Sequence, residues 1–163
     1  MKILTIIFLL TLSFSLVAQH KIVGHYRDYF GDRIQLNADS TFEYTWHFDL
    51  SASWTKGTWS LKKDTLYFQM LPIYDTISYK NNDGTSADKL ILSLNDTSER
   101  LTPEQYAGMG LPSGGQNFQS YPDKLFFKKG RLYKTYNGRL FVKKQKGFWT
   151  KKKWSPWFFK SDD

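Results

Sequence analysis

The stretch from Asp39 to Met70 alternates apolar and polar residues, and turn residues divide it into three pieces. Successive side chains of a β-strand point to opposite faces, so this period of two is typical of strands with one buried face. The first piece has an aromatic residue at every second position: Phe42, Tyr44, Trp46 and Phe48. Gly57 lies inside the second piece, where it indicates a bulge or a close approach by another backbone. The stretch therefore predicts three antiparallel strands that share an aromatic face.

Short alternating segments continue on both sides of this stretch. We expect further strands at residues 33–36, 73–79, 88–94, 124–129, 131–136 and 139–145. In the segment 88–94, Leu90, Leu92 and Leu94 are expected to face inward. Aromatic residues make up 18% of the chain, which favours strands over helices. With turn signals between the strands, the sequence predicts an all-β fold, a single antiparallel up-and-down β-barrel of about 8–10 strands.

Residues 1–19 have the features of a secretory signal peptide. Lys2 supplies a positive charge, Ile3–Val17 is an apolar run, and Ala18 is a small residue at its exit. The run is about 15 residues long, shorter than the ~20 of a membrane-spanning helix, although an uncleaved N-terminal anchor is the alternative. We therefore expect an exported protein, periplasmic or secreted, with one domain at residues 20–163.

The sequence contains no cysteine. This excludes a disulfide framework, a zinc–thiolate site and a thiol nucleophile. It also excludes a lipid-modified N-terminal cysteine, so the protein is not expected to be a lipoprotein. The folded domain must therefore be held together by packing alone.

Residues 95–122 interrupt the rhythm of the strands. Thr102, Pro103 and Gln105 form a helix-start pattern, in which threonine caps the helix, proline takes its first position and glutamine completes a capping box. Glycines end this helix within two turns, and the following residues are rich in Gly, Ser and Pro. Long insertions in compact domains are usually functional or disordered. We expect one short helix in a long loop that forms a lid across one end of the sheet.

Three short patterns occur in order: Gly24-x-Tyr26, then Asp39-Ser40-Thr41-Phe42, then Gly57-x-Trp59 followed by Asp64-Thr65-Leu66. Together they resemble the lipocalin-like domains of small exported bacterial proteins, over about residues 22–95. In that family an early Gly-x-Trp closes the base of an up-and-down barrel, and here Tyr26 takes the place of the tryptophan. The resemblance implies a barrel that can hold a small hydrophobic or amphiphilic ligand.

The aromatic face of the predicted strands has two interpretations. Its candidate ligand-binding residues are Tyr44, Trp46, Trp59 and Phe68. As structure, these side chains fill the core, where each contributes ~1.5–3 kcal/mol when buried. As function, they line a cavity, where Tyr and Trp supply polar groups to a ligand. Small eight-stranded barrels are either filled or hold one small ligand, so the sequence leaves both interpretations open.

The C-terminal part of the chain carries most of the positive charge. Residues 20–120 hold nine Lys and Arg against twelve Asp and Glu, whereas residues 121–163 hold thirteen against three. The candidate residues for binding an anionic surface are Trp149, Lys151, Lys152, Lys153, Trp154 and Trp157. Lysines attract anionic lipid or polysaccharide, and Trp is favoured at membrane interfaces. The alternative is a last strand that closes the barrel, with its aromatic side chains inside and its lysines in water.

No residue pattern identifies an enzyme, a metal site or a cofactor. His20, His25 and His47 fit no metal-ligand spacing, no nucleophile elbow surrounds a serine, and no glycine-rich loop opens a helix. We therefore expect no catalytic residue, metal or cofactor, and no nucleic-acid partner for an exported protein. The leading hypothesis is non-enzymatic binding of a small hydrophobic ligand. The alternative is a peripheral envelope protein that binds anionic lipid or polysaccharide, and a hydrolase built around His47 comes third.

Overall fold

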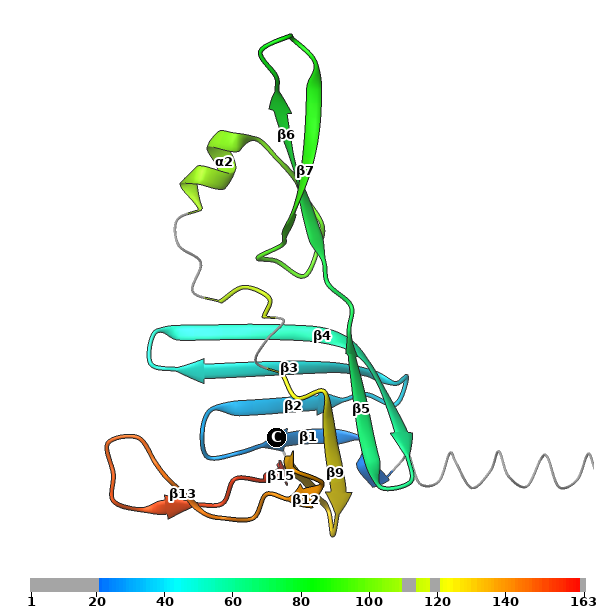
Figure 1. Ribbon diagram of the computed structural model, residues 1–163, viewed down its shortest axis with the longest axis vertical. Coiled ribbons are helices and arrows are strands. Elements are labelled where there is room, and N and C mark those ends of the chain that lie inside the picture. The colour runs from blue at the N-terminus through cyan, green and yellow to red at the C-terminus, as the bar shows by residue number, and fades with distance from the viewer. Residues whose placement is uncertain (1–20, 110–113, 118–120, 162–163) are drawn as a thin grey trace, which may run out of the picture.

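A computed structural model describes residues 21–109, 114–117 and 121–161, so the predicted signal peptide lies outside the described residues. Eight strands form a closed antiparallel barrel, in the lower half of Figure 1. In chain order they are β1 (Gly24–Arg27), β2 (Asp32–Leu36), β3 (Thr41–Phe48), β4 (Ser51–Lys62), β5 (Thr65–Met70), β9 (Lys124–Lys128), β10 (Arg131–Tyr133) and β15 (Phe158–Ser161). Each pairs with the next barrel strand along the chain and β15 pairs with β1, so the predicted all-β up-and-down barrel is confirmed.

Large apolar side chains fill the interior of the barrel. Along β3, Phe42 and Tyr44 are buried, whereas the alternate residues Thr41 and Glu43 are partly exposed, as the alternation predicts. The buried core takes side chains from all eight barrel strands: Tyr26, Ile34, Leu36, Phe42, Tyr44, Trp59, Leu66, Phe68, Leu125, Leu132 and Phe158. Burial of side chains of this size, at ~1.5–3 kcal/mol each, is the main force that holds the closed wall together.

Gly57 lies where the backbones of β4 and β5 approach each other. A Cβ at this position would overlap the carbonyl oxygen of Gln69 and would lie 2.9 Å from the Cα of Met70. The glycine therefore marks a close approach by a neighbouring backbone, which is one of the two outcomes that the sequence predicts.

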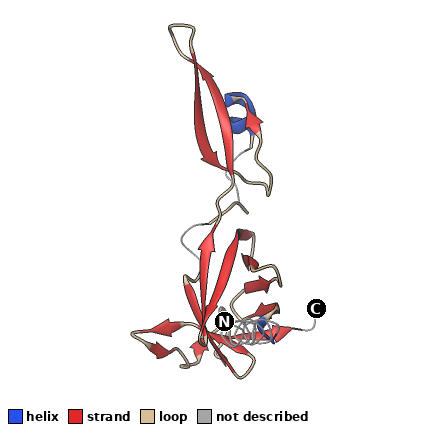
Figure 2. Cartoon of the chain, turned by 90° about the vertical axis from the view of Figure 1, so that its right-hand side faces the viewer, coloured by secondary structure: helices blue, strands red, loops and turns tan. Residues whose placement is uncertain are grey.

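Between β5 and β9 the chain leaves the barrel and forms a projecting arm (Figures 1 and 2). The arm consists of β6 (Tyr74–Lys80), β7 (Ser86–Leu92), β8 (Arg100–Leu101) and the helix α2 (Pro103–Gly108). β6 pairs antiparallel with β7 and parallel with β8, in a sheet separate from the barrel. The prediction that Leu90 faces inward was wrong: its side chain is 64% exposed, because β5 pairs directly with β9 and leaves no barrel position for β7.

The helix α2 begins as the sequence predicts. The Thr102 hydroxyl accepts a hydrogen bond from the Gln105 N–H, and the Gln105 side chain accepts one from the Thr102 N–H. The predicted lid was wrong for this element, because β8 adds to the edge of β6 and holds α2 beside β6 within the arm. Residues 114–117 then bring the chain back to the barrel, where the Trp54 N–H donates to the carbonyl of Gly115 at 3.2 Å.

A second excursion lies between β10 and β15 and forms two small hairpins. β11 (Thr135–Tyr136) pairs with β12 (Arg139–Leu140), and β13 (Gln145–Lys146) pairs with β14 (Lys153–Trp154). The chain then returns to the barrel as β15, whose Phe158 side chain is fully buried. The C-terminal segment therefore supplies both a surface feature and the strand that closes the wall.

Candidate functional site

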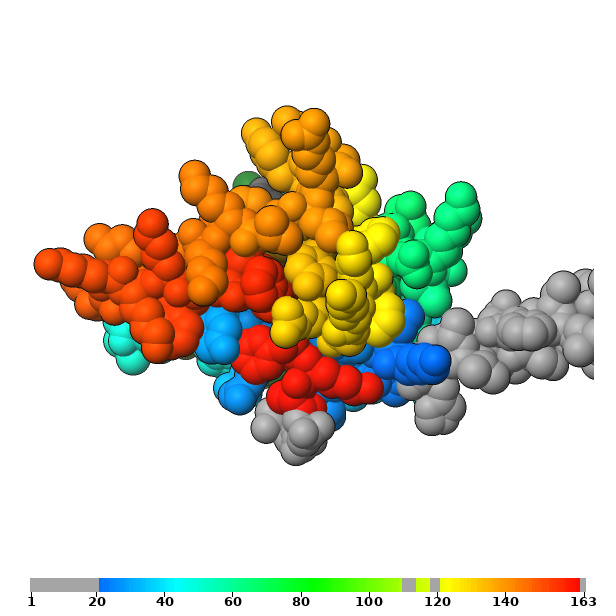
Figure 3. Space-filling model, turned by 90° about the horizontal axis from the view of Figure 1, so that it is seen from below, coloured from blue at the N-terminus to red at the C-terminus, as the bar shows by residue number. Residues whose placement is uncertain are grey.

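Basic and aromatic side chains gather on the hairpin formed by β13 and β14, residues 145–154, which we name the basic hairpin. In Figure 3 this orange-red segment projects beyond the barrel strands. Lys146 and Lys153 lie directly opposite each other in the strand register, and like charges in that position destabilise a strand pair. The hairpin therefore concentrates positive charge although this weakens its own strand pairing.

Trp149 stands at the tip of the basic hairpin. Its side chain is 99% exposed, and its backbone φ of 55° lies in the left-handed region. Five other non-glycine residues of the described chain also have a positive φ, so this conformation marks the turn of the hairpin. The neighbouring Phe148 side chain is also exposed. Exposure of two neighbouring aromatic side chains does not stabilise the fold, so the tip has the character of a contact surface.

Aromatic contacts hold the basic hairpin against the barrel. The ring of Phe148 lies 4.1 Å from that of Phe48 in β3, and the ring of Trp154 stacks on that of Tyr29 at 4.6 Å, measured between centroids. The ammonium group of Lys152 lies 4.0 Å from the centroid of the Trp154 ring. A groove of about 380 Å³ separates the hairpin from the turn between β1 and β2. The hairpin therefore has a defined place on the barrel.

The structure divides the six predicted surface residues into two groups. The exposed group is Trp149, Lys151, Lys152 and Lys153. Trp154 and Trp157 are partly buried, and the ring of Trp157 packs on that of Tyr133 with centroids 5.6 Å apart. The C-terminal segment therefore has features of both a closing strand and a surface segment. β15 closes the barrel, and the residues before it stay on the surface.

Three of the four predicted ligand-binding residues belong to the packed interior. The Tyr44 hydroxyl donates to a carboxylate at 2.7 Å, and the Trp59 Nε1–H donates to a backbone carbonyl at 3.2 Å. Phe68 packs edge-to-face on another ring of the core. Trp46 is only partly buried and stacks beside Phe48, which the basic hairpin contacts. The polar atoms of Tyr44 and Trp59 are therefore satisfied by the protein itself.

A buried polar cluster, which the sequence reasoning missed, lies next to the turn between β1 and β2. Asp28 and Asp32 are only 8% and 7% exposed. Asp32 accepts a hydrogen bond from the Tyr44 hydroxyl and pairs with Lys134 Nζ at 2.8 Å. Asp28 Oδ1 accepts from the Phe30 N–H at 2.7 Å, while Asp28 Oδ2 is buried without a partner among the described residues.

The sequence indicated the buried position of Asp32 but not its partner Lys134. The alternation in β2 places Asp32 on the same face as Ile34 and Leu36, so an acidic side chain had to face the interior. Lys134 gave no such signal, because it meets Asp32 across 102 positions of the sequence. This ion pair joins β2 to the connection after β10, and it therefore ties the second excursion to the barrel.

The buried setting raises the pKa values of Asp28 and Tyr44. Burial and, next, the negative charge of Asp32 raise the pKa of Asp28 to about 6 from its ordinary 3.8. Burial and the charge of Asp32 also raise the pKa of Tyr44 above its usual value, so its hydroxyl stays protonated and can donate. Asp28 therefore takes up a proton under mildly acidic conditions.

The raised pKa of Asp28 predicts how stability depends on pH. The folded protein keeps the Asp28 proton up to about pH 6, whereas the unfolded chain releases it near 3.8, so the contribution of Asp28 to stability falls as the pH rises through this window. Asp28→Asn keeps an oxygen acceptor and removes the charge. We expect it to raise the free energy of unfolding at neutral pH by about 1–2 kcal/mol and to flatten the pH profile. Urea unfolding at mildly acidic and at neutral pH measures both effects.

Asp83→Asn is the matched control for this prediction. Asp83 is exposed in the arm, where hydrogen bonds from Thr85 lower its pKa. Its contribution to stability is present at neutral pH and is lost as the pH falls, so this variant should gain no stability at neutral pH. An Asp28→Asn protein that is no more stable than the parent at neutral pH would contradict the prediction.

The histidines form no common site in the described part of the chain. His25 and His47 are separate exposed residues on β1 and β3, and His20 lies outside the described residues. Among the described residues, no three His, Cys, Asp or Glu side chains are grouped so that they could hold a metal ion. Within those same ranges, the structure contains no helix with the length and apolarity that a membrane crossing requires.

Comparisons of the chain with protein-family models, with curated proteins and with solved structures gave no match. The resemblance to lipocalin-like domains therefore stays a prediction.

Proposed function

We propose that the protein is an exported, non-enzymatic β-barrel that docks on an anionic lipid surface through its basic hairpin. The observation that carries the proposal is the tip of the hairpin, where Trp149 is 99% exposed and lysines surround it in the sequence. Trp is favoured at membrane interfaces, and a lysine near an anionic surface contributes about 1 kcal/mol to binding. Aromatic contacts already hold the hairpin on the barrel, so little conformational freedom is lost on docking.

A small hydrophobic ligand inside a lipocalin-like barrel is the weaker proposal. Such a ligand needs open space lined by unsatisfied polar groups or apolar walls. Here all eight barrel strands place large side chains in the interior, and Tyr44 and Trp59 already donate to protein acceptors. Docking through the basic hairpin requires no interior space, so the packed barrel favours surface docking over an internal ligand.

Co-sedimentation with phosphatidylglycerol vesicles tests the proposal. We expect Lys146→Ala combined with Lys153→Ala to weaken binding about thirtyfold, because each lysine contributes about 1 kcal/mol near such a surface. The same change removes a cross-strand repulsion, so the hairpin should be at least as stable as before. Trp149→Ala should weaken binding on its own, since it removes the interfacial indole. Salt at about 0.5 M should release the parent protein, because exposed charges are then screened within about 4 Å.

Lys80→Ala combined with Lys89→Ala is the control variant. Both lysines are exposed in the arm, so this variant loses the same net charge and keeps the basic hairpin intact. It should bind vesicles as the parent protein does. Equal binding by all variants would overturn the proposal, as would a parent protein that binds a soluble anionic polysaccharide and not the vesicles.

A further inference from the structure

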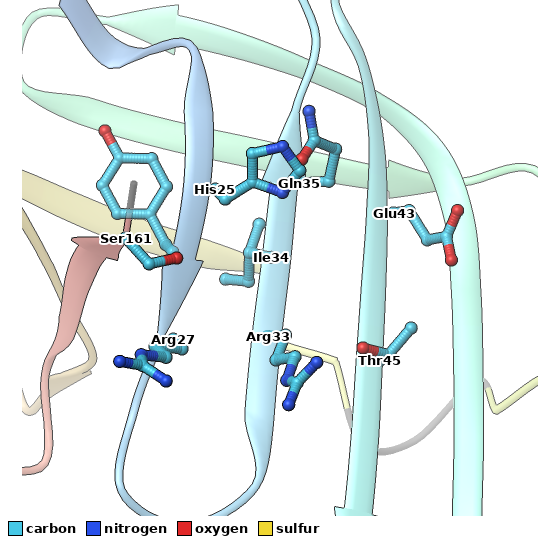
Figure 4. A pocket seen from close by; sticks show the side chains of 9 residues that line it. His25, Arg27, Arg33, Ile34, Gln35, Glu43, Thr45 and Ser161 are labelled. Carbon is cyan, nitrogen blue, oxygen red and sulfur yellow. The ribbon is translucent and has the colours of Figure 1, made fainter. Parts of the chain in front are cut away.

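A second basic surface lies on the outer face of β1, β2 and β3, on the other side of the wall from the packed interior. A hollow of about 290 Å³ opens there, and Figure 4 shows its side chains. Six of the side chains that line it are His25, Arg27, Arg33, Gln35, Thr45 and Ser161. Each of these six carries a hydrogen-bond donor, and the two guanidinium groups are permanently charged. The hollow therefore presents donors and positive charge to whatever enters it.

Arg27 and Arg33 lie directly opposite each other in the register of β1 and β2, and Figure 4 shows them at the same end of the hollow. Like charges in this position destabilise a strand pair. Both arginines are exposed, and among the described residues neither forms an ion pair with a carboxylate. The Arg27 guanidinium lies 5.4 Å from the centroid of the Phe159 ring, which limits its freedom. An anion between the two arginines would turn this repulsion into attraction.

One carboxylate, that of Glu43, also lines the hollow. In Figure 4 the Glu43 side chain points away from the two arginines. Its Oε2 lies 3.7 Å from Lys56 Nζ of β4, an ammonium group that is shared with Asp96 at 3.3 Å. The arginine end of the hollow therefore keeps its positive charge.

We infer that this hollow binds a tetrahedral oxyanion, a phosphate or sulfate group, between Arg27 and Arg33. A guanidinium presents paired N–H donors in one plane, which match two oxygens of such a group. Thr45 lies opposite Arg33 in the register and adds a hydroxyl on the same face. His25 faces outward beside Gln35 and supplies a donor to whatever the oxyanion is attached to, whereas the Gln35 amide nitrogen already donates to Asn37 at 2.9 Å. The inference does not rest on the proposed lipid docking, because no residue of the basic hairpin lines the hollow.

Isothermal titration of the whole protein with inorganic phosphate, and in parallel with sulfate, tests this inference. Arg27→Gln combined with Arg33→Gln should weaken phosphate binding at least tenfold. The same change removes the cross-strand repulsion, so the variant should melt no earlier than the parent in buffer without phosphate or sulfate. Phosphate should raise the Tm of the parent and leave that of the variant unchanged. Loss of binding in a variant that is equally stable cannot be attributed to unfolding.

Two control variants separate this site from the rest of the molecule. Lys80→Gln combined with Lys89→Gln removes two charges from the arm and should keep the affinity of the parent for phosphate. Lys146→Ala combined with Lys153→Ala should keep it as well, so that a failure of lipid docking and a failure of the oxyanion site are seen separately. No saturable binding of phosphate or sulfate, or equal affinity in the parent and the arginine variant, would overturn the inference.

The source of the oxyanion is distinguished with vesicles of equal surface charge. A preference for phosphatidic acid over phosphatidylglycerol, lost in the arginine variant, supports the inference and assigns a lipid phosphomonoester. Equal binding to both lipids, together with arginine-dependent binding of inorganic phosphate, supports it and assigns a soluble phosphate ester.

Discussion

Replacing Gly57 by alanine is expected to lower the free energy of unfolding by about 3 kcal/mol, at the upper end of the cost of overpacking. The added Cβ would overlap the carbonyl oxygen of Gln69 and would lie 2.9 Å from the Cα of Met70. Both obstacles are backbone atoms of β5, so they cannot rotate away as a flexible side chain does. The substitution therefore forces β4 and β5 apart in the closed wall. Urea unfolding followed by tryptophan fluorescence measures the loss.

Gly108→Ala is the control for this substitution. Gly108 is the last residue of α2, and a Cβ there would meet no atom within 4 Å. Alanine favours a helix over glycine by up to about 1 kcal/mol, so this variant should be neutral or slightly more stable. If the Gly57→Ala variant had the same free energy of unfolding as the parent, β4 and β5 would separate without cost, and the prediction would be wrong.

Phe158→Ala is expected to destabilise the protein by about 4 kcal/mol, the usual range for a buried phenylalanine being ~3–5 kcal/mol. Its side chain is fully buried, and it lies opposite Leu132 in the pairing of β15 with β10. The truncation leaves a cavity in the strand that joins β10 to β1. A loss of this size is a large share of the roughly 5–15 kcal/mol that stabilises a typical domain. Thermal and urea unfolding measure it.

Phe148→Ala makes the same substitution in the same C-terminal segment. The Phe148 side chain is 59% exposed and touches the barrel through Phe48, so we expect a cost below about 1 kcal/mol. Equal losses at the two positions would contradict the structural role given to β15. The contrast also shows why the basic hairpin is tested by point substitutions: a chain cut after Gly147 would lose β15 and with it the closure of the barrel.

Six of the eight barrel strands, β2 to β5, β9 and β10, were predictable because their signals are local. The alternation of Thr41–Phe48 fixes which side chains share a face, whatever strand lies next to it. The capping box of α2 links residues only three positions apart, so Thr102 and Gln105 could be identified from the sequence alone.

The arm was not predictable, because alternation identifies a strand without identifying its partner. The segments of β6 and β7 predict strands as the barrel segments do, yet β6 and β7 pair only within the arm. The pairing that excludes them from the wall joins Thr65 to Phe126, two positions far apart in the sequence. No local pattern encodes such a pairing, and the error at Leu90 follows from this.

The candidate sites were predictable in composition and not in geometry. The sequence identified the basic aromatic C-terminus, but Trp149 and Trp157 look alike there, and only the position of β15 decides which is exposed. The facing arginines on β1 and β2 depend on the register of the hairpin, in which Arg27 meets Arg33. The ion pair between Asp32 and Lys134 depends on closure of the whole barrel.

The seam of the barrel joins the first and last strands of the wall, since Tyr26 of β1 pairs with Lys160 of β15. β15 is the last of the eight barrel strands to be synthesised. Until it is in place, β1 and β10 each have an unpaired edge. Contacts between residues so distant in the sequence also form slowly. The wall therefore closes only when β15 has joined both neighbours, and any shorter part of the chain leaves two strand edges without a partner.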